Sequence, residues 1–147
     1  MHAVSMGETI AAIPLIKMLQ ARYPHVPIVV TTMTPTGAER VKQAFGDSVH
    51  HLYAPYDLPF AVKRFYKTIN PLIGVIMETE LWPNLLAIGF NHNIPMCLVN
   101  ARLSAKSAAG YGRIQSLARE ILSHLTLIAA HGAKDAERFI ALGANPE

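Results

Sequence analysis

The sequence has little cysteine, little charge and no long apolar run, and each of these absences excludes a class of protein. Cys97 is the single cysteine among 147 residues, which excludes a disulfide framework and a cysteine-based zinc cluster. Charged residues make up 16% of the chain, whereas about 25% is usual in soluble domains. No stretch reaches the roughly 18 consecutive apolar residues of a membrane span, because prolines, asparagines and a histidine interrupt the charge-free segment 81–101.

Charge and motif content narrow the range of functions further. The net charge is +3, and the 13 basic residues are spread along the chain rather than gathered in a stripe, so we expect no nucleic-acid partner. The chain has no phosphate loop, dinucleotide fingerprint, nucleophile elbow or His-Glu-x-x-His motif. The adjacent His50 and His51 would point to opposite faces of a strand and could not chelate together. We therefore expect no metal site.

Hydrophobic residues, at 51%, occur in an alternation of short apolar runs and longer amphipathic ones. The apolar runs predict strands, and the longer segments predict helices. This alternation predicts an α/β fold, a Rossmann-like doubly wound parallel sheet with helices on both faces and ligands at the carboxyl ends of the strands. We predict strands over 28–32, 49–53, 72–77, 96–100 and 125–130, and helices over 8–22, 35–45, 59–69, 82–93, 111–123 and 134–142.

Both ends of the sequence indicate that 1–147 is a single Rossmann-like domain of a longer protein. A central first strand should precede the first helix, yet only His2, Ala3 and Val4 stand before Ser5. The segment 143–147 closes the last predicted helix as if another strand were to follow. A surface that faces a second domain, a partner or a membrane would also explain the high share of hydrophobic residues.

The first polar cluster at a predicted strand end is Ser5-Met6-Gly7-Glu8. The Ser-x-x-Glu spacing is that of a capping box, with Ser5 as N-cap and Glu8 at the third helical position. A functional interpretation is also open, in which Gly7 lets a substrate approach closely and Glu8 acts as a base. From spacing alone the cap is favoured.

The second cluster is the threonine-rich segment 31–37, which leads into the second predicted helix. The hydroxyls of Thr34 and Thr36, with Gly37 at the helix N-terminus, could bind sugar hydroxyls or a phosphate. Capping by Thr34 accounts for most of the pattern, since Pro35 follows it at the first helical position.

The third cluster, Glu78-Thr79-Glu80-Leu81-Trp82, directly follows an apolar strand. If the strand continued, Glu78 and Glu80 would share a face and repel each other. A cap needs only one carboxylate, so this cluster is the least well explained by structure alone. Trp82 could cover a sugar ring or pack on the core.

Two further clusters follow the last two predicted strands. Arg102, in Asn100-Ala101-Arg102-Leu103-Ser104, could bind a carboxylate or phosphate of a ligand. It could equally pair with Glu78 or Glu80. His131, beside Gly132, is a candidate for the rim of the site.

Taken together, these segments resemble the 3-deoxy-D-manno-octulosonic acid (Kdo) transferase family. The resemblance covers essentially the whole chain, and it is most specific where two strings occur together and in order, E-T-E-L-W-P-N at 78–84 and N-A-R-L-S at 100–104. The strings at 5–8, 34–40 and 55–59 add to it.

The resemblance implies the N-terminal half of a two-domain GT-B glycosyltransferase that works without a metal ion or cofactor. Such an enzyme would move Kdo from CMP-Kdo to a lipid A precursor in lipopolysaccharide biosynthesis. It would be membrane-associated, at the cytoplasmic face of the Gram-negative bacterial inner membrane. Residues 1–147 would be the acceptor-binding domain, without the N-terminal membrane anchor and the C-terminal donor-binding domain. We therefore expect the isolated domain to fold but to be inactive.

The resemblance also assigns roles to individual residues. Glu8 matches the catalytic base of the family, beside Ser5 and Gly7. Glu80 matches an acidic residue of the acceptor cleft, and Glu78 precedes it in the same string. The cleft-lining segments are matched by Arg102 and by the turn that contains Thr34, Thr36 and Gly37. The sequence departs from the family pattern at Met6, where valine is common, and at His131-Gly132, where glutamine or another polar pair is more usual.

Two alternatives to a Kdo transferase stay open. One is a non-catalytic α/β binding module, such as a receiver-like or periplasmic-type domain, although Asp47 and Asp57 lie away from the positions that a receiver requires. The other is a different GT-B nucleotide-sugar enzyme, such as an epimerase, which would bind uridine rather than cytidine nucleotides. If the chain is part of a Kdo transferase, we expect Glu78, Glu80 and Arg102 to line one cleft together with Glu8.

Overall fold

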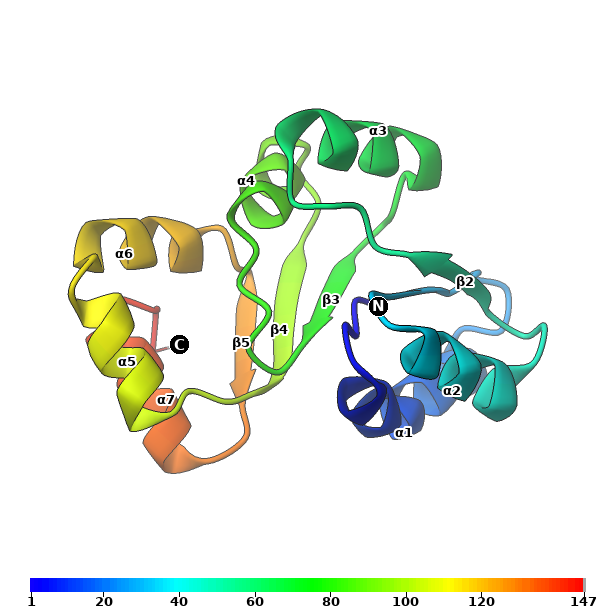
Figure 1. The fold of residues 1–147 in the computed structure, drawn as a ribbon, viewed down its shortest axis with the longest axis horizontal. Coiled ribbons are helices and arrows are strands. Elements are labelled where there is room, and N and C mark those ends of the chain that lie inside the picture. Colours follow the sequence, from blue (N-terminus) through cyan, green and yellow to red (C-terminus); the bar gives the residue numbers. More distant parts are fainter. Residues whose placement is uncertain (147) are drawn as a thin grey trace. The chain divides into compact units, whose positions relative to one another are not determined.

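The computed structural model describes residues 1–146, which fold as two compact units that divide after Ala54. Each unit has its own parallel sheet and its own helices, and each is described by itself (Figure 1).

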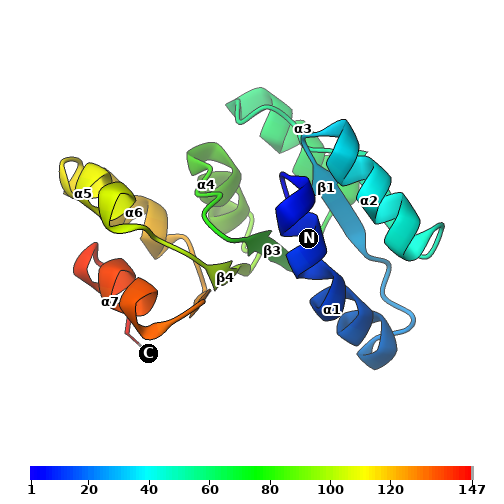
Figure 2. The ribbon, with the colours of Figure 1, turned by 60° about the horizontal axis from the view of Figure 1, so that its bottom comes forward.

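The first unit consists of α1 (Met6–Arg22), β1 (Val29–Thr32), α2 (Pro35–Phe45) and β2 (His50–Tyr53). The two strands pair in parallel, with Val29 opposite His50. The helices α1 and α2 lie side by side (Figure 2). The core is formed by buried apolar side chains of both helices and β1, Ala12, Ile16, Val30, Val41 and Phe45.

Before α1, His2 forms a parallel bridge with Thr31 of β1. The short segment in front of Ser5 therefore pairs with β1 as the expected first strand would. The chain then turns into α1 at the carboxyl end of that pairing, and the turn contains Ser5 and Glu8.

The second unit begins with α3 (Pro59–Ile69), β3 (Gly74–Met77), α4 (Pro83–Asn91) and β4 (Met96–Ala101). It continues with α5 (Ala105–Gly112), α6 (Gln115–Ser123), β5 (Leu127–Ala130) and α7 (Ala133–Ala141). The three strands form a parallel sheet in the order β3-β4-β5, so their carboxyl ends share one edge.

One face of this sheet carries the core of the second unit. Ile76 and Leu98 are neighbours across β3 and β4, and both are fully buried in a cluster with side chains of α3, α4, α6 and α7. Because successive strands are added in one direction, right-handed crossovers place α4 and α6 on the same face, where they contact each other. The opposite face carries Cys97 and Leu127 and is more exposed.

The predicted Rossmann-like alternation and the parallel strands are confirmed, although the described strands pair in two sheets rather than one. The main error concerns the predicted helix 111–123. Ile114 has a non-helical backbone (φ −125°, ψ 46°), which separates α6 from an additional helix, α5, with Ser104 as its N-cap. The sequence hid α5 because Gly110 and Gly112 disfavour a helix. Smaller shifts shorten β3 and β5, which leaves Leu72 outside the strand and 79% exposed.

Candidate functional site at the carboxyl ends of the strands

At the start of α1, Ser5 is the predicted N-cap, and two hydrogen bonds join it to Glu8. Ser5 Oγ accepts a hydrogen bond from the backbone N–H of Glu8 (3.3 Å) and donates one to Glu8 Oε1 (2.9 Å). The other carboxylate oxygen, Oε2, accepts from the backbone N–H of Val4 (2.9 Å). Glu8 is only 7% exposed, so its carboxylate is held in one orientation. The cap is confirmed, and the role of Glu8 as a base stays a prediction.

Gly7 is exposed, one position before Glu8. A Cβ added at Gly7 would meet only Ser5 Oγ, at 3.9 Å. The fold therefore does not require glycine here, and the surface beside Glu8 is open to the close approach of another molecule. This is compatible with the predicted substrate contact at Gly7.

At the start of α2, Thr34 acts as the predicted N-cap, since its hydroxyl accepts a hydrogen bond from the backbone N–H of Gly37 (3.1 Å). The Thr36 hydroxyl is exposed and donates to Thr34 Oγ1 (3.4 Å). Gly37 is buried, and a Cβ there would lie 3.0 Å from Thr34 Oγ1 and 3.3 Å from Thr32 Cβ. Close packing of α2 against β1 thus explains Gly37, whereas the ligand contacts predicted for Thr34 and Thr36 stay predictions.

In the second unit, one side chain from the end of each strand joins a hydrogen-bonded chain. Asn100 Nδ2 donates to Glu78 Oε1 (3.4 Å), and Asn100 Oδ1 is 2.9 Å from His131 Nδ1. Glu78 and Asn100 both adopt left-handed backbone conformations, with φ of 58° and 52°. The register of β4 against β5 also shifts at Asn100. Such strained positions and bulges in strands are concentrated where side chains are aimed at a ligand.

The left-handed turn at Glu78 corrects the idea that β3 continues through both acidic residues. The strand ends at Met77, so Glu78 and Glu80 do not share one face of a strand. Glu80 Oε2 instead accepts a hydrogen bond of 2.6 Å from Trp82 Nε1. Trp82 thereby orients one of the two carboxylates.

Arg102 follows β4 on the same edge of the sheet and is exposed. Within residues 1–146 it forms no ion pair with Glu78 or Glu80, so the interpretation of Arg102 as their internal partner is wrong. Its guanidinium is accessible to an anionic group from another molecule.

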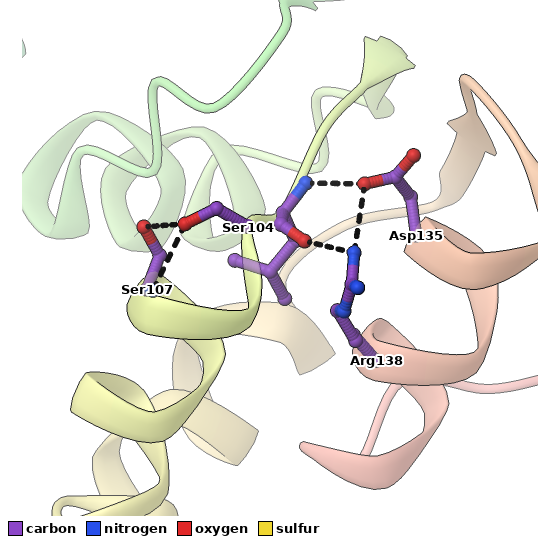
Figure 3. Close-up of polar contacts among 5 residues, drawn as sticks. Ser104, Ser107, Asp135 and Arg138 are labelled. Carbon is purple, nitrogen blue, oxygen red and sulfur yellow. Dashed lines mark hydrogen bonds and ion pairs between the residues drawn. The ribbon is translucent and has the colours of Figure 1, made fainter.

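The loop that carries Arg102 is held by α7 (Figure 3). The backbone N–H of Leu103 donates to Asp135 Oδ1 (2.8 Å), and Arg138 Nη1 donates to the Leu103 carbonyl (2.9 Å). Arg138 also lies 3.7 Å from Asp135 Oδ1. On the other side of Leu103, Ser104 caps α5. Sequence reasoning missed Asp135 and Arg138, because their partner lies more than 30 residues away along the chain.

A helix cap supplied by a distant residue holds the segment after Glu80. Asp57 accepts hydrogen bonds from the backbone N–H groups of Asn84 (3.0 Å) and Leu85 (2.8 Å), at the N-terminus of α4. The N-cap residue of α4, Trp82, supplies no side-chain cap itself. Nearby, the Tyr66 hydroxyl donates to the Leu85 carbonyl (2.9 Å). Burial, together with the charge of Asp57, raises the pKa of Tyr66.

The structure therefore brings Glu78, Glu80 and Arg102 to the carboxyl edge of one sheet, as predicted. Glu8 belongs to the other unit, and a cleft shared by all four residues stays a prediction. Across residues 1–146, no three histidine, cysteine or acidic side chains gather in a way that could hold a metal ion. No helix in that part of the chain is both long and apolar enough to cross a bilayer.

The comparison with known proteins agrees with the motifs. The family of 3-deoxy-D-manno-octulosonic-acid transferases (kdotransferases) matches residues 1–147. The chain belongs to this family. It is 51% identical over 142 residues to the 3-deoxy-D-manno-octulosonic acid transferase of Haemophilus influenzae, over 97% of this chain and 33% of that protein.

Two other members of this Kdo transferase family are also similar over nearly the whole chain. The transferase of Bordetella pertussis is 39% identical, over 98% of this chain and 34% of its own length. A probable mitochondrial transferase of Arabidopsis thaliana is 38% identical, over 99% and 33% respectively. The chain thus spans about a third of the length of these curated relatives.

Proposed function

We propose that this chain is the acceptor-binding N-terminal domain of a GT-B glycosyltransferase that moves Kdo from CMP-Kdo to a lipid A precursor. The observation that carries the proposal is the family match over 1–147, together with relatives named as Kdo transferases. The polar side chains at the strand ends, where ligands of parallel α/β sheets bind, agree with it. The donor CMP-Kdo is held mainly by a separate C-terminal domain.

In this proposal Glu8 is the general base. A hydroxyl of the acceptor is a weak nucleophile at neutral pH and needs a carboxylate within about 2.6–3.2 Å to take its proton. The hydroxyl oxygen attacks the anomeric carbon of Kdo while the bond from that carbon to the phosphate oxygen of CMP breaks. CMP leaves with the bonding electrons, and the proton moves to Glu8.

The environment of Glu8 suits this role in two respects. The N-terminus of α1 favours negative charge, so the helix supports the ionised carboxylate. The backbone N–H of Val4 and the hydroxyl of Ser5 donate to different oxygens of the carboxylate. The same bonds fix the direction of the carboxylate, which general-base catalysis requires.

The other carboxyl-end residues bind substrate in the proposal. Arg102 is exposed and provides a two-pronged donor for a phosphate of the acceptor. Glu78 and Glu80, together with Thr34 and Thr36, accept or exchange hydrogen bonds with sugar hydroxyls. The full-length protein would be membrane-associated at the cytoplasmic face of the bacterial inner membrane, where its lipid acceptor lies, and would need no metal ion.

The test is a transfer assay on the full-length protein that contains this chain, with CMP-Kdo and a lipid A precursor in the presence of a chelator. We expect transfer of Kdo by the full-length protein and none by residues 1–147 alone. Turnover of a uridine sugar instead of CMP-Kdo would support an epimerase-like enzyme and overturn the proposal. Transfer by the isolated chain would contradict the division of labour between the domains.

A further inference from the structure

The hydrogen-bonded chain Glu78–Asn100–His131 fixes the position of a proton. An ionised carboxylate can only accept, so the group of Asn100 that faces Glu78 must be its NH₂. The carbonyl oxygen of Asn100 then faces His131, at 2.9 Å from Nδ1. Because that oxygen can only accept, Nδ1 must carry the proton, and Nε2 of the neutral imidazole is a bare acceptor.

The backbone holds this arrangement in place. Both Glu78 and Asn100 occupy left-handed conformations that non-glycine residues rarely adopt, and the register shift at Asn100 turns its side chain out of the ordinary strand alternation. The backbone N–H of His131 donates to the carbonyl of Ala101 (2.8 Å), which anchors the histidine to the bulged strand. The side chain of His131 is exposed, so its Nε2 is accessible to a ligand.

We infer that His131 Nε2 accepts a hydrogen bond from a hydroxyl group of the sugar acceptor, with its tautomer set by Asn100 and Glu78. The inference deepens the proposed function and rests on it. The residues at this edge of the sheet favour a hydroxyl as the ligand group. Glu78 and His131 Nε2 both accept hydrogen bonds, and the hydroxyls of a sugar can donate them. A phosphate group carries between one and two negative charges at neutral pH, so its oxygens mainly accept hydrogen bonds, and it would be repelled by the charge of Glu78. His131 is thus a residue that determines specificity for the acceptor.

Three variants of the full-length enzyme separate this role from a structural one. His131→Gln keeps an N–H for Asn100 and turns a carbonyl oxygen outward, so the Michaelis constant for the lipid A precursor should stay within about twofold of the parent. His131→Leu removes the acceptor and should raise that constant about tenfold, the usual value of one lost hydrogen bond. Asn100→Gly fits the left-handed backbone but removes the hydrogen bond to His131 Nδ1, and should also raise the Michaelis constant.

The matched control is Asn93→Gly. Asn93 has a similar left-handed conformation, with φ of 55°, but lies at the amino end of β4. This variant should leave the Michaelis constant unchanged. Melting temperatures of all four variants show whether any loss of function reflects unfolding.

The tautomer is read directly from long-range ¹H–¹⁵N spectra of the histidine rings, with His131→Gln used to assign the signal. We expect a protonated Nδ1 and a bare Nε2, and a shift of the Nε2 signal when the lipid A precursor is added. A proton on Nε2 would overturn the inference and leave the proposed function standing. The same holds if the parent is active and its His131→Leu variant binds the acceptor normally. A parent that transfers no Kdo would overturn the proposed function, and the spectrum would still decide the tautomer.

Discussion

Asp135 and Arg138 of α7 form a clamp on the loop, because they bind the backbone N–H and the carbonyl of Leu103. This clamp predicts a measurable loss of stability when Asp135 is replaced by alanine. Asp135→Ala removes the acceptor of a 2.8 Å hydrogen bond from the Leu103 N–H, and Leu103 is fully buried. A buried donor left without a partner costs about 1–3 kcal/mol. The partly buried ion pair with Arg138 adds between zero and about 1 kcal/mol. We therefore expect a loss of about 2 kcal/mol in the free energy of unfolding of the second unit.

Urea denaturation of the chain, followed by circular dichroism, measures this loss. Asp135→Asn is the matched control, because its amide oxygen can still accept from Leu103 while the charge opposite Arg138 is lost. It should cost about 1 kcal/mol or less. If Asp135→Ala unfolded at the same urea concentration as the parent, the clamp would contribute nothing and the reasoning would be wrong.

The clamp also predicts a coupling to Arg102 in the full-length enzyme. Asp135→Ala should raise the Michaelis constant for the acceptor in the parent but not in an Arg102→Ala background, because the clamp acts through the loop that positions Arg102. Additive effects in this double-mutant cycle would show that Asp135 serves folding only.

The remaining predictions concern stability. Gly37→Ala should destabilise the first unit by about 1–3 kcal/mol, because its Cβ would crowd Thr34 and Thr32; Gly110→Ala, where nothing lies within 4 Å, should stabilise α5 by about 0.5–1 kcal/mol. Urea midpoints measure both, and equal effects would refute the packing argument. Burial lowers the pKa of His2 to about 4. Since the unfolded chain protonates this histidine near pH 6.5, stability should fall by up to about 3 kcal/mol as the pH drops from about 6.5 to 4, and His2→Asn should flatten this dependence.

Local patterns were predictable from the sequence, because their partners lie within one turn of a helix. Ser5 and Glu8 cap α1 with the spacing that the capping box requires, and Thr34 caps α2 as Pro35 indicated. The parallel strands followed from the apolar runs, and the strand ends supplied the candidate site residues.

Contacts between distant segments were not predictable. Asp57 caps α4 across 27 residues, and Asn100 reaches His131 across 31, so no spacing rule connects them. The left-handed turn at Glu78 was also hidden, since glutamate carries no preference for positive φ as glycine does. The fold therefore follows from patterning, while the way the site is held together depends on tertiary structure.

The central claim, that Glu8 is the base of a Kdo transferase, is tested most directly by Glu8→Gln in the full-length enzyme. The amide oxygen can still accept from Val4 or Ser5, so the cap should lose only about 0.3–1 kcal/mol of charge–dipole energy. Glutamine cannot take up the proton, and loss of a general base slows a reaction by about 10²–10⁴-fold. We predict that the variant melts almost as the parent does, binds the lipid acceptor and transfers Kdo at least about 10²-fold more slowly. Near-normal turnover would show that Glu8 only caps α1, and the base would then have to be sought at Glu78 or Glu80.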